Sequence, residues 1–277
     1  MSVYLRPATL TEAISGLTGP DVAVLAGGTD LYPMAQGAAL HGTVVDIAEV
    51  PGLRGISAVD GSLRIGACTT WTDVMRADLP PALSALQTAA RQVGGWQIQN
   101  AGTVGGNLCN ASPAADGVPP LLACEAQVEV AGPDGVRRMH LSAFITGPRR
   151  TTLGRGEILV AVVIPAAGLA GRSAFLKLGA RAHLVISIAM VAVRIVVSDG
   201  IVTAAALAVG SASPVAWRLP GVEAALVGVA IGHVPDAIDQ GLVAAALSPI
   251  DDIRATAAYR VQAAVTLLRR AVAEAVA

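Results

Sequence analysis

The most informative stretch of the chain is QIQNAGTVGGNLCNASPAAD, residues 97–116. They combine three glycines, Gly102, Gly105 and Gly106, with small hydroxyl and amide side chains. Glycine permits left-handed backbone and lets a ligand approach the main chain closely. Successive N–H groups in such a turn form a concave site for an anion, most often a phosphate. A shorter run of the same kind, LAGGTD, spans residues 25–30. Two such turns favour a ligand with two linked phosphates, so a dinucleotide is the first hypothesis.

The composition is that of a globular chain without a polyanionic partner. Its 277 residues are 53% hydrophobic, enough for one large domain or two modest ones. The net charge of −1 lacks the basic excess of a nucleic-acid-binding protein. No apolar run is long enough to span a membrane, and the N-terminus does not have the pattern of a signal peptide. We therefore expect no nucleic-acid partner, no membrane span and a cytoplasmic location.

Neither the cysteines nor the histidines form a recognisable chemical site. Cys68, Cys109 and Cys124 lack metal-ligand spacing, which favours reduced thiols in a cytoplasmic protein. An iron–sulfur cluster takes about four cysteines, so this chain is not expected to hold one alone. The chain has no HExxH pattern, GxSxG elbow, P-loop or GxGxxG fingerprint. We expect no metal site and no catalytic side chain, with Cys109 and Trp71 packed in the core.

Local signals predict alternating short strands and helices over the first 170 residues. Thr9 or Thr11 can cap the first helix, and Thr29 or Asp30 the second. The Asp-Gly pair at residues 60–61, between alternating apolar residues, is a strong hairpin signal. The expected strands are residues 22–25, 43–47, 56–59, 63–65, 127–130, 136–141 and 158–164, and the expected helices are residues 9–17, 30–34, 70–75, 80–93 and 119–124.

The pattern changes after a linker at residues 168–171. A last, long helix is expected to open at Pro249, with Asp251 and Asp252 in its first turn, and to reach Ala275. The other expected elements are strands at residues 173–178, 186–197 and 201–209 and helices at residues 220–227 and 235–246. Strands followed by helices describe an α+β unit, with helices on one face of an antiparallel sheet.

A ligand such as FAD would explain two glycine turns without an acid–base cluster, because the cofactor then carries the redox chemistry. Several segments also match a known family in order and spacing: YLRPATLTEA (residues 4–13), VLAGGTDLYP (24–33), LRIGA (63–67), QIQNAGTVGGNLCNASPAAD (97–116), ITGPRRTTL (145–153), EILVAVVIP (157–165), SAFLKLGAR (173–181) and SPIDDIRATAAYR (248–260). Through them the chain resembles, over almost its whole length, the flavin-binding (medium) subunit of the molybdenum-containing hydroxylases. This is the xanthine dehydrogenase and carbon monoxide dehydrogenase group.

The resemblance implies an α+β fold in two domains. The first, residues 1–170, would be a two-lobed FAD-binding domain of the vanillyl-alcohol-oxidase (PCMH) type, with lobes of about 1–52 and 53–170 that meet at Pro51-Gly52. The second, residues 171–277, would be a small α+β domain with an antiparallel sheet and helices. FAD would bind noncovalently, with its pyrophosphate between the two glycine turns. The implied cofactor-binding residues are Leu25, Ala26, Gly27, Gly28, Thr29, Asp30, Leu31, Ala101, Thr103, Gly105, Gly106, Asn107, Asp116, Leu159 and Lys177.

Four of the later polar residues have separate expectations. On the resemblance, Asp116 hydrogen-bonds polar groups of the cofactor, and Lys177 stabilises negative charge on the reduced flavin by Coulomb attraction. Each has a structural alternative: Asp116 can cap a helix, and Lys177 can be a solvated charge at a strand end. Arg181 and His183 follow in a loop that the resemblance puts near the flavin ring. Some relatives carry an inserted cysteine cluster, which the cysteine count here argues against.

The implied function is electron transfer within a heterotrimer or a dimer of heterotrimers. A large subunit with a molybdenum cofactor would oxidise the substrate, and a small subunit with [2Fe-2S] clusters would relay electrons. This chain would deliver them through FAD to an external acceptor, and alone it would hydroxylate nothing. Two alternatives stay open: a self-sufficient FAD-dependent oxidase or reductase of the same cofactor fold, and a non-catalytic nucleotide-binding or assembly module. A visible flavin spectrum would distinguish the electron-transfer subunit and the self-sufficient enzyme, which both carry FAD, from the non-catalytic module.

Overall fold

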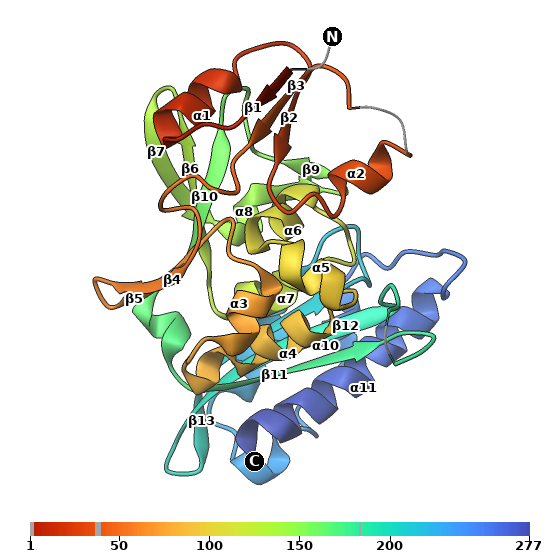
Figure 1. Cartoon of the computed structure of the whole chain (residues 1–277). Coiled ribbons are helices and arrows are strands. Elements are labelled where there is room, and N and C mark those ends of the chain that lie inside the picture. The colour runs from red at the N-terminus through yellow and green to blue at the C-terminus, as the bar shows by residue number, and fades with distance from the viewer. Residues whose placement is uncertain (1–2, 37–39, 183) are drawn as a thin grey trace.

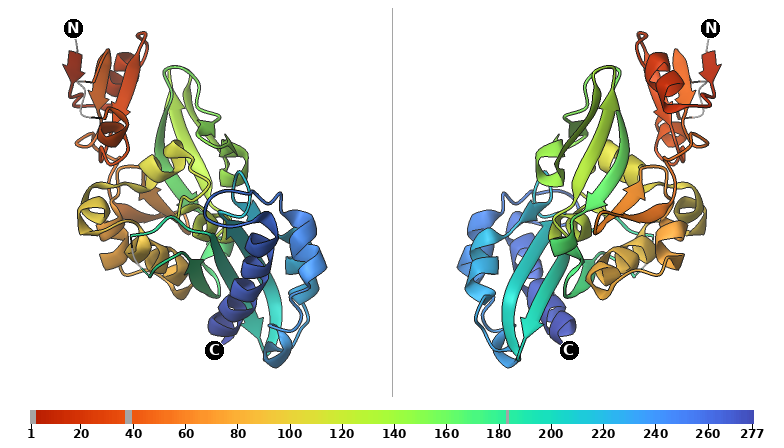
Figure 2. Two further views of the ribbon diagram at one scale, coloured as in Figure 1. Left: turned by 90° about the vertical axis from the view of Figure 1, so that its right-hand side faces the viewer. Right: turned by 90° about the vertical axis from the view of Figure 1, so that its left-hand side faces the viewer.

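A small parallel sheet opens the chain (Figure 1). The computed structural model describes residues 3–36, 40–182 and 184–277. The sheet has the order β1-β3-β2 and contains β1 (Val3–Leu5), β2 (Val22–Leu25) and β3 (Thr43–Asp46). α1 (Leu10–Gly16) begins after Thr9, whose side chain accepts a hydrogen bond from the Glu12 N–H, and α2 (Leu31–Met34) follows the first glycine turn. Figure 2 shows this unit at one end of the molecule, away from the C-terminal helix.

An antiparallel sheet of five strands follows, in the order β4-β5-β10-β6-β7. Its strands are β4 (Ile56–Val59), β5 (Ser62–Gly66), β6 (Gln127–Gly132), β7 (Gly135–His140) and β10 (Ile158–Ile164). Asp60 and Gly61 have φ angles of 49° and 75°, the left-handed values that a two-residue type I′ hairpin needs. All seven residues of β10 are buried, which accounts for its unbroken apolar sequence.

Short helices cover this sheet and lead from it to the rest of the chain. They are α3 (Trp71–Arg76), α4 (Ser84–Gln92), α5 (Trp96–Ala101), α6 (Val104–Asn110), α7 (Val118–Ala123) and α8 (Leu141–Phe144), with 3-10 turns at Pro81–Leu83 and Ala166–Leu169 and a small β8 (Ile145–Gly147) and β9 (Arg150–Thr151) pair. Thr70 and Asp73 form a reciprocal capping box at the start of α3. Trp71 is buried in the core, as expected.

The last part of the chain is a four-stranded antiparallel sheet with helices. The strands are β11 (Arg172–Leu178), β12 (Ala189–Ser198), β13 (Ile201–Gly210) and β14 (Trp217–Arg218), in that order. The helices are α9 (Pro220–Leu226), α10 (Gln240–Ala246) and α11 (Ala257–Val276), with a 3-10 turn at Ile231–His233. The antiparallel sheet and the α+β class are as predicted.

Both faces of this sheet are covered. Its own helices pack on one face, while α4 and α7 from the preceding part of the chain pack on the other (Figure 1). Phe175 and Met190 point into this second layer and meet alanines of α4 and α7. The same layer holds the buried Arg194, whose guanidinium donates to the carbonyl oxygens of Ala123, Ala167 and Ala170. The two parts of the chain therefore meet through a buried, packed layer.

Two helix boundaries differ from the sequence expectation. The last helix starts at Ala257, not Pro249, because Thr256 caps it and Asp252 is used in a separate turn. There Asp252 accepts hydrogen bonds from the N–H groups of Arg254 and Ala255. The helix expected at residues 235–246 occupies only Gln240–Ala246, capped by the Asp239 side chain. Among the described residues, no helix has both the length and the apolar character needed to cross a membrane.

Candidate cofactor site

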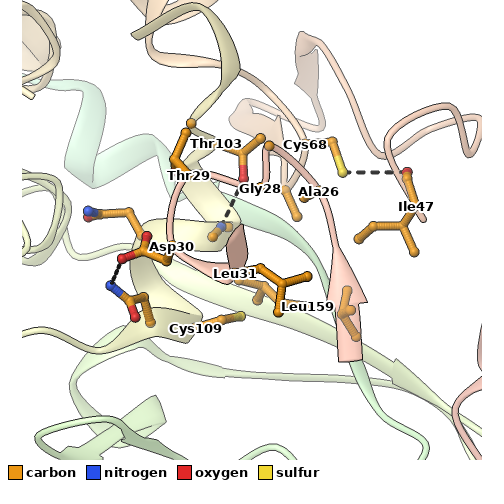
Figure 3. A pocket seen from close by; sticks show the side chains of 18 of the residues that line it. Ala26, Gly28, Thr29, Asp30, Leu31, Ile47, Cys68, Thr103, Cys109 and Leu159 are labelled. Atoms are coloured by element: carbon orange, nitrogen blue, oxygen red, sulfur yellow. Dashed lines mark hydrogen bonds between the residues drawn. The ribbon is translucent and has the colours of Figure 1, made fainter. Parts of the chain in front are cut away.

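A cavity of about 350 Å³ lies where the first glycine turn, α6 and β10 meet (Figure 3). This volume falls in the usual range of small-molecule sites, about 300–1,000 Å³. One wall is the turn between β2 and α2, and another wall is the start of α6. Leu153, Ile158 and Leu159 contribute apolar side chains from β10 and the segment before it. The cavity thus combines apolar walls with two glycine-rich segments.

The first glycine turn presents unpaired main-chain N–H groups beside this cavity. Within residues 3–36, 40–182 and 184–277, the N–H groups of Gly27, Gly28, Thr29 and Asp30 have no hydrogen-bond acceptor, and all four residues line the cavity. Gly28 has a φ of 70°, a left-handed value that favours glycine. The Asn110 side chain donates a 2.8 Å hydrogen bond to the Asp30 carboxylate and so fixes that end of the turn. Consecutive free amides of this kind suit an anion such as a phosphate.

The second glycine segment is built differently from what its sequence suggests. Here the backbone forms α6, and the amides of both glycines, Gly105 and Gly106, are used within the protein. The Gly105 N–H donates to the Ala67 carbonyl oxygen at 2.8 Å, and the Gly106 N–H donates to Thr103 Oγ1 at 3.0 Å (Figure 3). A Cβ on Gly105 would lie 2.6 Å from the Ala67 Cβ. These glycines therefore permit close packing, and this segment turns polar side chains such as Asn107 toward the cavity.

The two segments touch at one point of very close approach. A Cβ on Gly27 would lie 1.8 Å from the Ala101 carbonyl oxygen and 3.1 Å from the Gly102 Cα. Only glycine at position 27 allows the first turn to rest on the end of α5. Contact between the segments is thus direct, and each fixes the position of the other.

Most of the residues that the sequence singled out meet at this cavity. Those that line it are Ala26, Gly27, Gly28, Thr29, Asp30, Leu31, Thr103, Gly105, Gly106, Asn107 and Leu159. Leu25, Ala101, Asp116 and Lys177 do not line it. Leu25 is buried in its strand, and Ala101 supports Gly27 from behind. Further lining residues that sequence reasoning did not select include Val93, Ile98, Cys68, Cys109 and Asn110. Cys109 and Asn110 belong to the quoted motif, whereas Val93 and Cys68 gave no signal beyond their apolar neighbours.

Asp116 and Lys177 form a buried ion pair close to the cavity. Lys177 Nζ donates to the Asp116 carboxylate at 2.9 Å, and the two side chains are only 7% and 10% exposed. The Ser187 hydroxyl donates to the other carboxylate oxygen at 3.2 Å. Burial raises the pKa of Asp116 above its ordinary value, although Lys177 acts in the opposite direction. Lys177 is thus neither a solvated strand-end charge nor a residue of the cavity wall, and the pair ties the motif to β11.

The loop after β11 gives less information about the site. Arg181 is exposed and donates to the Leu184 carbonyl oxygen. His183 lies outside the described residues.

No group of three His, Cys, Asp or Glu side chains within the described ranges could hold a metal ion. The three thiols are free, and burial raises the pKa of both Cys68 and Cys109 to about 12. Both thiols at the cavity are therefore protonated at neutral pH.

Comparison with known proteins agrees with this geometry. Residues 1–167 match the family described as the FAD binding domain in molybdopterin dehydrogenase, and residues 174–275 match the CO dehydrogenase flavoprotein C-terminal domain. This chain belongs to the FAD-binding medium subunits of the molybdenum hydroxylase family. A protein of Escherichia coli (strain K12), provisionally named xanthine dehydrogenase FAD-binding subunit, is 35% identical over 99% of this chain and 96% of its own. The carbon monoxide dehydrogenase medium chain of Hydrogenophaga pseudoflava is 30% identical over 97% and 94% of the two chains.

A solved relative extends the likeness to the whole fold of this medium subunit. Reconstituted CO dehydrogenase from Oligotropha carboxidovorans contains a chain that superposes with a TM-score of 0.90 at 29% identity. The match covers 100% of this chain and 98% of that chain. The family identified from sequence motifs is therefore confirmed by both sequence and fold.

Proposed function

We propose that this chain is the flavoprotein electron-transfer subunit of a heterotrimeric molybdenum hydroxylase or dehydrogenase. It would receive electrons from the [2Fe-2S] clusters of a small partner subunit and deliver them to an external acceptor. A large partner subunit would hold the molybdenum cofactor and the substrate. The observation that carries the proposal is the row of unpaired amides at residues 27–30, which belong to residues that line a cavity of suitable size in a chain of an FAD-binding family.

The cavity residues fit FAD by their chemistry. The diphosphate would accept hydrogen bonds from the amides of Gly27, Gly28, Thr29 and Asp30. Hydrogen bonds to charged oxygens are stronger than hydrogen bonds between neutral groups. Leu31 and Leu159 would contact the rings, and the side chains of Thr103 and Asn107 would supply polar contacts across the cavity. When bound there, FAD supplies the redox chemistry. Binding would be noncovalent, because the thiols at the cavity are protonated and so are poor nucleophiles.

The residues behind the cavity would orient this site. Ala101 supports Gly27, and Leu25 anchors the turn in the sheet. The Lys177 ammonium lies 3.5 Å from the Gln92 carbonyl oxygen, one residue before Val93 in the cavity wall. A buried positive charge behind this wall would favour a more negative cofactor, while Asp116 holds the lysine in position. Both residues would thus act on the cofactor, although neither lines the cavity.

The organisation of the chain follows from the same proposal. Residues 1–170 would form the FAD-binding domain in two lobes, about 1–52 and 53–170, and residues 171–277 the C-terminal domain. The two matched family regions, residues 1–167 and 174–275, support a boundary near residue 170. Three free thiols and no disulfide among the described residues support a cytoplasmic location.

The experiment is a purification of this chain with and without its two partner subunits. The chain alone should carry FAD, visible as oxidised flavin absorption, and should reduce dyes only when given a chemical reductant. Substrate hydroxylation should require the large and small subunits. Turnover of a substrate by the isolated chain would favour a self-sufficient oxidase or reductase, and a colourless preparation would favour a non-catalytic nucleotide-binding module.

A further inference from the structure

A second, open hollow lies on the other side of α3 and α5 from the cofactor cavity. Its volume is about 990 Å³. The residues around it come from α3, from the end of α4, from α5 and from the loop after β11. In Figure 1 α3 and α5 lie side by side above α4, on the surface of the molecule. We call this hollow the α5 surface.

The cofactor cavity and the α5 surface share one wall. Val93 and Ile98 line the cavity, while Gly94, Trp96 and Gln99 from the same segment line the α5 surface. The same alternation occurs in α3, where Trp71 lines the cavity and its neighbour Thr72 lines the α5 surface. An α-helix with its side chains is about 10–12 Å across. A group seated on the α5 surface is therefore separated from the cofactor cavity by roughly one helix.

The chemistry of the α5 surface is that of a protein interface with an acidic partner. Trp96 is 82% exposed and Leu184 is 59% exposed, so two large apolar side chains face solvent. Arg76 and Arg91 also line the hollow, and within the described residues neither guanidinium has a hydrogen-bond or ion-pair partner. No carboxylate is among the lining residues, all of which are described. Exposed Trp and Arg are the residue types that carry most binding energy at protein interfaces.

The helix between the α5 surface and the cofactor cavity limits which kind of partner can act through this surface. Hydride transfer needs reacting atoms about 3–3.5 Å apart, which the intervening helix prevents. A one-electron carrier needs only to lie near the cofactor, without contacting it. A second copy of this chain is disfavoured, because a two-fold interface brings the same patch together and no carboxylate of that patch could pair with the arginines. The remaining occupant is a protein that carries a one-electron centre behind an acidic face.

We propose that the α5 surface is the docking site for an acidic face of the small [2Fe-2S] subunit, an inference that rests on the proposed function. Trp96 and Leu184 would fill apolar pockets of that partner, and Arg76 and Arg91 would pair with its carboxylates. The cluster nearest this chain would then lie behind the wall of the cofactor cavity. The external acceptor would approach from another side, where it can touch the cofactor.

The test measures assembly rather than turnover. The FAD-loaded chain is titrated with the isolated small subunit, and the native complex is purified in parallel. Trp96→Ala and Arg91→Glu should each raise the dissociation constant for the small subunit by about tenfold or more. Matched control variants at exposed positions away from the α5 surface, Trp217→Ala and Arg270→Glu, should leave it unchanged. All four should keep the FAD content of the unaltered chain, since none of these residues lines the cofactor cavity.

Several outcomes would overturn this assignment. They are unchanged affinity of both α5-surface variants for the small subunit, weakened binding of the large subunit alone, loss of self-association alone, or a changed KM for the external acceptor with assembly intact. A different result would contradict the proposed function itself: the unaltered chain would carry no FAD or would not bind the small subunit. If the unaltered chain binds normally and the variants bind equally well, only the docking site is wrong.

Discussion

The contact between Gly27 and the end of α5 allows a direct perturbation of the proposed FAD site. In Gly27→Ala the new Cβ would lie 1.8 Å from the Ala101 carbonyl oxygen, whereas ordinary contact begins at 3.4 Å. The atoms that the new Cβ would meet all belong to the backbone, so no flexible side chain can yield. The first glycine turn and α5 would have to separate by about 1.6 Å. That shift moves the amides of residues 27–30 relative to the rest of the cavity wall.

The size of the effect follows from the contacts that would be lost. Overpacking of this kind costs about 1–3 kcal/mol of stability. A hydrogen bond to a charged oxygen contributes about 1.5–3 kcal/mol, and each 1.4 kcal/mol is roughly tenfold in affinity. Loss of one such bond to the diphosphate therefore predicts a dissociation constant for FAD that is about 10–100-fold higher. Gly232→Ala is the control, because a Cβ there meets nothing within 4 Å.

The assay is flavin fluorescence quenching during titration of the apoprotein, with thermal unfolding of the same samples. Gly232→Ala should match the unaltered chain in both. Wild-type FAD affinity in Gly27→Ala would refute the reasoning, whether or not the melting temperature falls. It would mean that the turn does not hold the cofactor.

Three further predictions concern charges and thiols. Lys177→Met should cost about 3–5 kcal/mol in denaturant unfolding, because it leaves the buried Asp116 without its partner; a double variant with Asp116→Asn should recover much of this, and additive losses would contradict the pairing. The Arg254 N–H, more than the nearby guanidinium groups, lowers the pKa of Asp252 from 3.8 to about 2. Its contribution to stability is therefore complete above pH 3.8 and is lost as the pH falls toward 2, so Asp252→Asn should remove that part of the acid dependence of unfolding, and an unchanged acid limb would count against it. Burial raises the pKa of Cys68 to about 12, so the folded protein should protect this thiol from alkylation at pH 8 until it unfolds, as followed by mass spectrometry; rapid labelling of the native chain would contradict this protection.

The elements that sequence reasoning placed well are those whose signals are local. Thr9 and Thr70 cap helices that start where their hydroxyl groups can accept an amide hydrogen bond. The hairpin at Asp60-Gly61 needs only the left-handed backbone that this pair readily adopts. In each case the information lies within three or four residues, so a pattern in the sequence was enough.

The start of the last helix was misplaced because tertiary contacts determine it. Asp252 has the character of a first-turn residue, and Pro249 that of a helix start. In the structure the Asp252 carboxylate is held by Arg254 and by the buried Arg260. This arrangement forms a turn of its own, and the helix begins only after Thr256. Arg260 is buried and donates to the main-chain carbonyl oxygens of Ile188 and Ser211, next to the ends of β12 and β13, which no local pattern shows.

Most of the residues predicted for the cofactor site lie around one cavity, but their internal arrangement differs from the expectation. Both glycine segments were expected to offer amides. The amides of Gly105 and Gly106 are instead used within the protein, because Ala67, which lies far from the second segment in the sequence, accepts the Gly105 N–H, and the Thr103 side chain accepts the Gly106 N–H. The pairing of Asp116 with Lys177 likewise joins residues 61 positions apart. Spacing within a motif shows where glycine is required, but the direction of each amide depends on segments that come together only in the fold.

A structure of the FAD-loaded complex would test the central claim most directly. We predict diphosphate oxygens at about 2.7–3.2 Å from main-chain nitrogens of Gly27, Gly28, Thr29 or Asp30. A cofactor whose diphosphate lies away from all four nitrogens would contradict the account, even if FAD occupied another part of the same cavity.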